Sequence, residues 1–290
     1  MLQKRSRFIA ESRLDGSEAR RDLMPDRSNT SRSPGESPLI SVVMVVFNAV
    51  ATMRTTIQSL ADQTYRHVDF VVIDGGSTDG TLEVLHQYRD RIDYQSSEKD
   101  NGIYDAMNKG VAAARGDWIV FLNSGDTFAG PEVLHKIFGR ELPSQIDVIY
   151  GNTVLKSSRE IMRLPANIDK KFFYFETLCH QSIFARRELF ERIGKFGAHY
   201  RIIGDREWLF RLAEAGGRFA HVDVDVCVWD PEGFSSANAA VSQLEVSEFQ
   251  SRHFTRSERA LLPWVMRLKN LGRKLGRGLT RLSREQVTHV

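Results

Sequence analysis

The chain has 290 residues, of which 41% are hydrophobic, 27% charged and 10% aromatic. This balance excludes collagen-like, fibrous and wholly disordered proteins. The formal net charge of +3 at pH 7 argues against a protein that coats itself with nucleic acid, so we expect no nucleic-acid partner.

The charge is unevenly distributed along the chain. Residues 1–35 carry a net charge of +3 and residues 252–290 carry +8, which leaves −8 for the segment between them. The N-terminal segment is rich in Arg and Ser and ends in Pro and Gly, which predicts a disordered arm over 1–37. The segment 251–290 places leucines three or four residues apart among Arg and Lys, which predicts a basic amphipathic helical tail. Such a tail suits either packing on the domain or contact with an anionic membrane surface.

Cysteine content and hydropathy indicate the cellular compartment in which the protein works. The chain has two cysteines, Cys179 and Cys227, so a disulfide framework is not expected and a reducing environment is favoured. No stretch has the composition of a secretory signal or of a membrane-spanning helix. We therefore expect a cytoplasmic protein whose membrane contact would be peripheral, on the inner face of the cytoplasmic membrane.

The central part of the chain begins with alternating strand and helix patterns. A continuous apolar run at 39–47 predicts a strand that is buried on both faces. Helical periodicity at 51–61 leads to a second buried strand at 68–74. A glycine-rich turn at 75–80 then opens a helix at 81–90. The order strand, helix, strand predicts a βαβ unit.

This alternation continues along the chain. The remaining predicted elements are helices at 103–115, 186–193 and 205–215 and strands at 117–123, 147–155 and 221–229. The pattern predicts an α/β fold with a mixed, mostly parallel sheet flanked by helices.

Polar segments follow the predicted strands, where an open α/β sheet binds its ligands. They are Phe47–Asn48, Asp74–Asp79, Glu98–Asp105 and Asn123–Asp126. Three of them contain carboxylates, which suit a hard divalent cation such as Mg²⁺ or Mn²⁺ and, through it, a diphosphate ligand.

Structural roles compete with ligand binding at single positions in these segments. We interpret Asp79 as a residue of the turn that begins a helix. Spacing alone also favours a turn role for Asp74 over a ligand-binding role, and the same holds for Asp126. The pattern GxGxxG is absent, which argues against a dinucleotide-binding domain.

Five blocks stand in a fixed order along the chain: PLISVVMVVFNA, VVIDGGSTDGT, SEKDNGIYDAMNKGVAAARGDWIVFLNSGD, HQSIFARRELFERIGKF and GDREWLFRL. Together they resemble the family 2 inverting glycosyltransferases of the bacterial polysaccharide-assembly type, which have a GT-A fold. The resemblance covers about residues 38–230. It implies a GT-A glycosyltransferase domain over 38–250, followed by the basic tail.

The resemblance implies residues for a nucleotide-sugar donor site. In this family an aromatic residue and an Asn at the end of the first strand lie near the nucleotide base, which points to Phe47 and Asn48. The aspartate after the second strand, here Asp74, would accept a hydrogen bond from the base. The block E-x-D-x-G-x-Y-D-A-x-N-K-G borders the ribose, diphosphate and sugar in relatives, which points to Asp100 and Asp105.

The resemblance also implies a metal ligand. The family motif of two aspartates after the next strand reads Asn123-Ser124-Gly125-Asp126 here, so one carboxylate of the pair is present. Asp126 is therefore the expected ligand of Mg²⁺ or Mn²⁺, which would stabilise the diphosphate leaving group.

Inverting transfer requires a base that takes the proton of the acceptor hydroxyl. In related sequences this base is an acidic residue in the block that reads GDREWLFRL here, which implies Asp205, with Glu207 as the second candidate. Asp205 could alternatively cap the helix that follows it. His180 and Gln181 lie in a block that is close to the acceptor in relatives.

These expectations combine into an enzyme that transfers a sugar from a nucleotide-diphosphate-sugar donor to a hydroxyl acceptor, with inversion and metal assistance. We expect a lipid-linked sugar or a polysaccharide glycan as the acceptor. Two alternatives stay open: a sugar nucleotidyltransferase, and a degenerate donor-binding or scaffold protein without catalytic activity.

Overall fold

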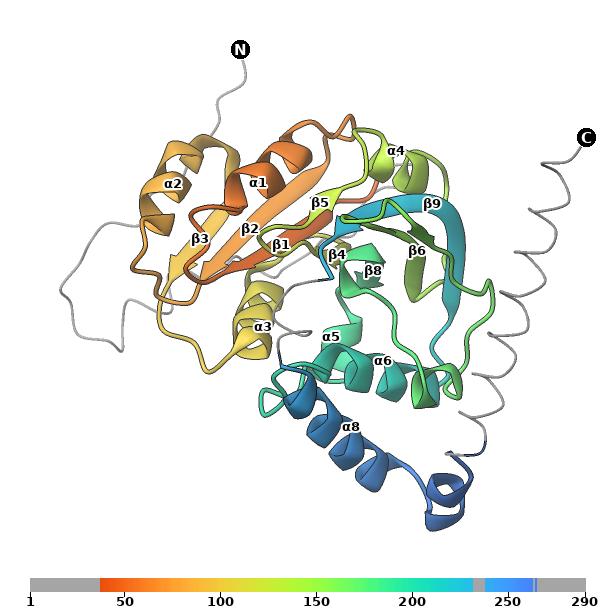
Figure 1. Ribbon diagram of the computed structural model, residues 1–290. Coiled ribbons are helices and arrows are strands. Elements are labelled where there is room, and N and C mark those ends of the chain that lie inside the picture. The colour runs from red at the N-terminus through yellow and green to blue at the C-terminus, as the bar shows by residue number, and fades with distance from the viewer. Residues whose placement is uncertain (1–36, 232–237, 263, 265–290) are drawn as a thin grey trace, which may run out of the picture.

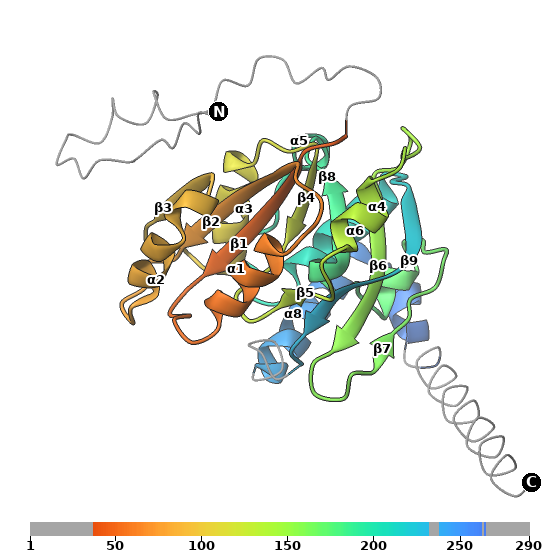
Figure 2. The same cartoon turned by 90° about the horizontal axis from the view of Figure 1, so that it is seen from above.

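The computed structural model describes residues 37–231, 238–262 and 264 (Figure 1). Within these residues one mixed sheet has the strand order β3-β2-β1-β4-β8-β6-β9-β5, and β7 pairs with β6 outside this path. Helices cover both faces of the sheet, as Figure 2 shows from above.

The first half of the chain forms the parallel part of the sheet. Its elements are β1 (Ile40–Val46), α1 (Met53–Ala61), β2 (Val68–Asp74), α2 (Thr81–Gln87), a 3₁₀ turn (Arg89–Arg91), β3 (Tyr94–Ser97), α3 (Ile103–Ala113) and β4 (Trp118–Phe121). Strand β1 pairs in parallel with both β2 and β4. The carboxyl ends of these three strands therefore meet at one edge of the sheet.

Every residue of β1 is buried because both faces of the strand are covered. Val43 and Val45 pack in a core cluster with residues of α3, whereas Val42 and Met44 pack in a second cluster with residues of α1 and α2. This two-sided packing explains the continuous apolar run in the sequence.

The second half of the chain extends the sheet with both antiparallel and parallel pairs. Its elements are β5 (Thr127–Phe128), α4 (Val133–Phe138), β6 (Val148–Leu155), β7 (Ile161–Met162), 3₁₀ turns at Phe172–Tyr174 and His180–Ser182, β8 (Ile183–Arg186), α5 (Leu189–Arg192), α6 (Gly204–Glu214), β9 (Phe219–Trp229) and α8 (Ala239–His253). Strand β8 lies antiparallel between β4 and β6, and β9 pairs in parallel with β6.

The strands and helices predicted from the sequence are present, with ends that differ by a few residues. The prediction missed β3, β5, β7, β8, α4 and α8. Strand β3 reads YQSS and is only partly buried, so it carries no apolar signal, and β8 has four residues, too few for a periodic pattern. Helix α8 has a weakly amphipathic sequence with two buried side chains.

The C-terminal segment packs against the domain beyond residue 250. Phe249, Phe254 and Leu262 are buried in the same core cluster as Trp208 and Phe210 of α6. The domain packing thus continues to Leu262. The predicted arm at 1–36 and most of the predicted tail, from 265 on, lie outside the described residues. Among the described helices, none combines the length and the apolar character that a membrane span requires.

Candidate active site

The loop after β1 is fastened to the loop after β2. Asn48 has a left-handed backbone (φ 48°), and its N–H donates to the Ser77 hydroxyl at 2.7 Å. The Asn48 Oδ1 atom accepts the N–H of Thr78 at 2.9 Å. Phe47, just before it, is 64% exposed. These two hydrogen bonds join the loops, and the Phe47 ring beside them is exposed to solvent at the edge of the sheet.

Asp74 is fully buried at the end of β2, and its carboxylate is surrounded by donors. It accepts the N–H groups of Gly76 and Ser77, both at 3.0 Å, and the hydroxyls of Ser77 and Ser97. These bonds hold the glycine-rich turn in shape and tie it to β3. Direct contact of this carboxylate with a nucleotide base stays a prediction.

Three segments of the predicted donor site converge at Gly75. A Cβ atom on Gly75 would collide with the Asp100 carboxylate and would touch the Phe47 ring at 3.4 Å. The absence of a side chain therefore lets the ends of β1 and β2 and the loop before α3 meet. Asp100 is also held in place by the N–H of Gly102 at 2.9 Å.

Asp105 lies in the first turn of α3 and is engaged within its own segment. Its carboxylate accepts the N–H of Asn101 at 3.0 Å and forms an ion pair with Lys109 at 3.3 Å. The bond from Asn101 is the main reason that the pKa of Asp105 is lowered, and Lys109 adds to this effect against the opposing effect of burial. A role in donor binding stays a prediction for this residue.

Asp126 ends the turn after β4, and α1 holds this turn. The Thr56 hydroxyl of α1 accepts the N–H of Gly125 at 3.0 Å and donates to the Asp126 carbonyl at 2.7 Å. The Asp126 carboxylate is 7% exposed and accepts the Gln181 side-chain N–H at 2.6 Å. Burial raises the pKa of Asp126, and the bond from Gln181 opposes this only in part.

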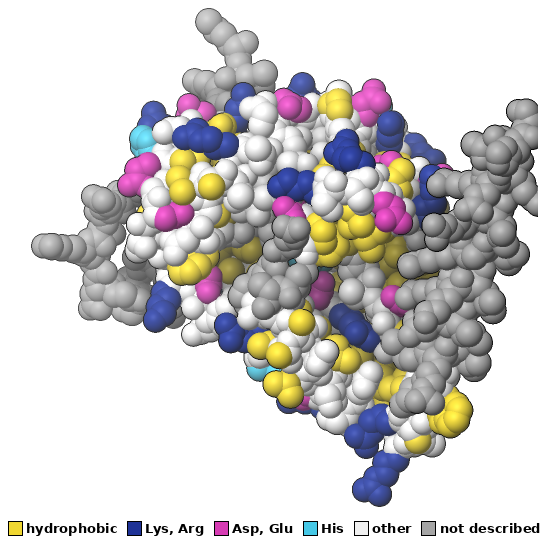
Figure 3. All heavy atoms as spheres, viewed as in Figure 1, with side chains coloured by type: hydrophobic (Ala, Val, Ile, Leu, Met, Phe, Trp, Pro, Cys, Tyr) yellow, Lys and Arg dark blue, Asp and Glu magenta, His cyan; other side chains and the backbone are white. Residues whose placement is uncertain are grey.

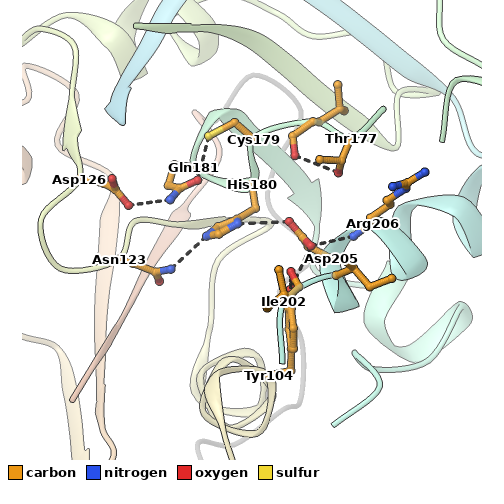
Figure 4. A network of polar contacts seen from close by, with 12 residues as sticks. Tyr104, Asn123, Asp126, Thr177, Cys179, His180, Gln181, Ile202, Asp205 and Arg206 are labelled. Carbon is orange, nitrogen blue, oxygen red and sulfur yellow. Dashed lines mark hydrogen bonds and ion pairs between the residues drawn. The ribbon is translucent and has the colours of Figure 1, made fainter. Parts of the chain in front are cut away.

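His180 connects this turn with α6, as Figure 4 shows. Its Nδ1 atom lies 3.3 Å from Asp205 Oδ2, and its Nε2 atom lies 3.0 Å from the Asn123 side-chain nitrogen. Burial lowers the pKa of His180, but the hydrogen bond and the charge of Asp205, with smaller contributions from Cys179 and Asp126, outweigh burial and raise the pKa above its ordinary value. The consecutive residues His180 and Gln181 thus contact Asp205 and Asp126, respectively.

Asp205 lies in the first turn of α6, with its carboxylate nearly buried. Its Oδ1 atom accepts the N–H of Arg206 at 2.8 Å and lies 3.0 Å from the Tyr104 hydroxyl of α3. The same hydroxyl lies 2.6 Å from the carbonyl of Ile202. The carboxylate is therefore oriented by α3, by its own helix and by His180.

Glu207 does not join this cluster. Its carboxylate forms an ion pair with Arg211 at 2.8 Å, and the His253 Nε2 atom of α8 lies 3.6 Å from it. The consecutive residues His180 and Gln181 therefore contact Asp205 and Asp126, whereas Glu207 is directed toward α8.

The side-chain oxygens of the turn after β4 suit a cation that is bound by the protein and by a diphosphate together. Within the described residues, no group of three His, Cys, Asp or Glu side chains is arranged to hold a metal ion. The turn after β4 offers the Asp126 carboxylate, and the nearby Asn123 Oδ1 atom is buried with no hydrogen-bond partner among the described residues. Because Mg²⁺ is commonly bound by one or two carboxylates together with substrate phosphates, these residues fit such a cation.

Sequence reasoning did not single out Tyr104, Asn123 or Glu245 as site residues. Tyr104 lies within the block that was matched to the family, so that match could have identified it as a site residue. Asn123 occupies the first position of the metal motif. Glu245 lies on a helix without any recognisable motif, and its contact with the loop before α6 follows from the tertiary structure alone.

Comparisons with known sequences identify relatives of this chain. The model of the family described as "Glycosyl transferase family 2" matches residues 41–194. A "PGL/p-HBAD biosynthesis glycosyltransferase" of Mycobacterium tuberculosis is 32% identical over 182 residues, which cover 61% of this chain and 69% of the relative. An uncharacterized glycosyltransferase of Haemophilus influenzae is 33% identical over 118 residues, covering 40% of this chain and 47% of the relative.

Solved structures share the fold. TarS of S. aureus, residues 1–349 in complex with UDP-GlcNAc, gives a TM-score of 0.60 at 19% identity and covers 73% of this chain and 66% of that chain. A mannosyltransferase from Pyrobaculum calidifontis in complex with GDP-Man and Mn²⁺ gives 0.60 at 17% identity, with coverages of 76% and 65%. In a further TarS structure this chain spans 41% of the matched chain. These likenesses confirm the GT-A fold that was expected from the sequence.

Proposed function

Because the chain belongs to glycosyl transferase family 2, we propose that it moves a sugar from a nucleotide-diphosphate-sugar donor to a hydroxyl acceptor with inversion at the anomeric carbon. One observation carries the proposal. Asp126 and Asp205, from opposite halves of the chain, are contacted by the consecutive residues Gln181 and His180, respectively. A residue for the leaving group and a residue for the attacking hydroxyl are thus held by one short segment.

The donor would bind along the carboxyl ends of β1 and β2. The exposed ring of Phe47 offers a stacking surface for a nucleotide base. The Asp100 carboxylate, packed against Gly75, can accept hydrogen bonds from ribose hydroxyls. The structural neighbours that hold UDP-GlcNAc and GDP-Man support a donor of this class.

The leaving-group side centres on Asp126. A bound Mg²⁺ or Mn²⁺ would neutralise the charge that develops on the diphosphate as the glycosidic bond breaks. Asp126, with the Asn123 amide oxygen nearby, would hold this ion. Gln181 keeps the Asp126 carboxylate in position through the 2.6 Å hydrogen bond. The Mn²⁺ present in the mannosyltransferase structure supports this assignment.

Asp205 would act as the base. As the acceptor oxygen attacks the anomeric carbon from the face opposite the diphosphate, its proton passes to the Asp205 carboxylate. Tyr104, His180 and the N–H of Arg206 orient that carboxylate before the acceptor arrives. Holding the base in a single orientation is a recognised source of rate enhancement.

The acceptor we propose is a lipid-linked sugar or a polysaccharide glycan, reached at a membrane surface. Near the end of the described chain Leu261 is 61% exposed and Trp264 is 66% exposed. Figure 3 shows hydrophobic side chains beside Lys and Arg at the lower end of the molecule, where α8 and the following segment lie. An apolar anchor beside a basic sequence is typical of contact with anionic lipid.

The proposed activity is tested with purified protein, a panel of UDP-, GDP- and dTDP-sugars, and Mn²⁺, by measuring released nucleoside diphosphate. Because water can replace the acceptor hydroxyl, we expect slow release from the matching donor even without acceptor, and EDTA should abolish it. Production or consumption of pyrophosphate would indicate a nucleotidyltransferase instead. Donor binding without release, also in the presence of membrane extract as an acceptor source, would indicate a non-catalytic protein.

A further inference from the structure

The carboxylate of Glu245, on α8, is buried against the loop that leads into α6. Its Oε1 atom accepts the N–H of Arg201 at 2.6 Å. Its Oε2 atom accepts the N–H groups of Ile202 and Ile203 at 3.0 and 3.1 Å. Glu245 is 7% exposed, so these three bonds are shielded from water. One side chain of α8 therefore satisfies three consecutive backbone donors.

These three donors lie immediately before Gly204, the first residue of α6, and Asp205 follows Gly204 in the chain. Ile203 is the N-cap residue of α6, and no side chain within the helix caps that end. The N–H groups at a helix start need external acceptors, and a carboxylate there also complements the partial positive charge of the helix end. Of the three donors, the Ile203 N–H belongs to the helix start, and Glu245 supplies its acceptor and a negative charge from α8.

The same loop is fixed on its other side by α3. The Tyr104 hydroxyl lies 2.6 Å from the Ile202 carbonyl and 3.0 Å from Asp205. Gly204 lies between them, and a Cβ atom there would come within 2.8 Å of the Tyr104 ring. The start of α6 is thus held between α3 and α8.

We infer that Glu245 is a positioning residue for the proposed transfer reaction. It holds the loop 201–203 so that the carboxylate of Asp205 points toward His180, and it touches neither donor nor acceptor. This inference rests on the proposed function, in which Asp205 is the base. It extends the active unit to α8, which lies beyond residues 41–194 of the family match.

The test compares E245Q with E248Q in the full chain. Glutamine has one acceptor oxygen and directs an amide N–H₂ group toward the remaining backbone donor, so the loop should loosen. Glu248 lies on the same helix and pairs with Arg252 instead of with the backbone of residues 201–203, so E248Q is the matched control. We expect E245Q to lower kcat about tenfold or more, because small misplacements of a catalytic group are costly, and to leave the donor KM within about twofold. E248Q should match the wild type.

Hydrogen exchange provides a readout that needs no substrate. In E245Q the amides of residues 201–203 should exchange faster than in the wild type and in E248Q, since they lose an acceptor. E245D keeps the charge on a side chain one methylene shorter, and we expect an intermediate kcat and intermediate exchange. If E245Q does not fold, E245D tests the inference in its place.

Four results separate the possible failures. A folded E245Q with the kcat of E248Q would overturn the inference, as would a folded E245D with wild-type kcat and wild-type exchange at 201–203. A rise in donor KM at unchanged kcat would also contradict it, because the loop would then serve donor binding. A wild-type protein that transfers no sugar from any donor would contradict the proposed function itself.

Discussion

Asp205 is the residue whose surroundings are most specific. Three groups orient its carboxylate, whereas the other buried acid of the same helix turn, Glu207, contacts Arg211 and His253. Asp205→Asn removes the proton acceptor and preserves the side-chain shape. We expect turnover to fall by a factor of about 10² or more, the usual scale for a lost general base, while donor binding measured by calorimetry is kept.

The matched control for this change is Glu207→Gln, which alters a buried carboxylate two positions further on without changing a residue that contacts His180. It should retain at least a large part of the turnover. If E207Q were inactive and D205N active, Glu207 and not Asp205 would be the base.

His180 gives stability a pH dependence that can be measured. Asp205 raises the pKa of the imidazole above its ordinary 6.5 despite the lowering effect of burial. A group whose pKa is raised in the folded state stabilises the protein fully below its unfolded pKa, and this contribution is lost as the pH rises through the folded pKa. In denaturant unfolding, the stability lost in His180→Gln should therefore be larger at about pH 6 than at about pH 9. Equal losses at both pH values would contradict the pairing with Asp205.

Helix α3 is the element that joins the two halves of the site. Its Tyr104 touches the start of α6, and its first turn borders the donor loops. The helix can lie this close to the sheet because Gly110 faces Val43 of β1, and a Cβ atom there would collide with the valine side chain. Val43 is fully buried between α3 and its neighbours, so it has no room to move.

We expect Gly110→Ala to destabilise the fold by about 1–2 kcal/mol, because overpacking of a closed core exceeds the gain of about 1 kcal/mol in helix propensity. Urea unfolding measures this difference. Gly130→Ala is the matched control, since no atom lies within 4 Å of a Cβ placed there, and it should be close to neutral. A stabilised G110A would show that α3 does not press on β1 as described.

The molecule as a whole combines a domain of negative net charge with a basic C-terminal sequence. Residues 265–290 contain seven Lys and Arg and one Glu. Each basic residue near an anionic leaflet contributes about 1 kcal/mol, and salt screens this attraction. We expect the full chain to sediment with vesicles that contain phosphatidylserine, and less so at high salt.

A chain shortened after residue 264 should stay in the supernatant. It keeps Phe254 and Leu262, which are part of the core, so its fold and its donor turnover should be unchanged. Vesicles of phosphatidylcholine alone serve as the control for charge. Equal sedimentation of the two chains with anionic vesicles would contradict the role proposed for the basic segment.

The amino-acid sequence was sufficient for the parts of the protein whose signal is local. The buried run of β1, the strand of β2 and the turn at 75–80 follow from apolar patterning and glycine, and the ordered blocks identified the family and its GT-A fold. Asp126 and Asp205 could be named because each lies in such a block. Short or polar elements such as β3 and β8 carry no comparable pattern and depend on their neighbours for burial.

Contacts between distant segments required the folded chain. No pattern in the sequence links Gln181 to Asp126, His180 to Asp205, or Glu245 to the loop at 201–203, because side-chain hydrogen bonds across tens of residues depend on how the helices and strands pack. The orientation of Glu207 away from Asp205 was settled in the same way. Local physics fixes which residues form a strand or a helix, whereas the packing of α3, α6 and α8 against the sheet fixes which carboxylates meet.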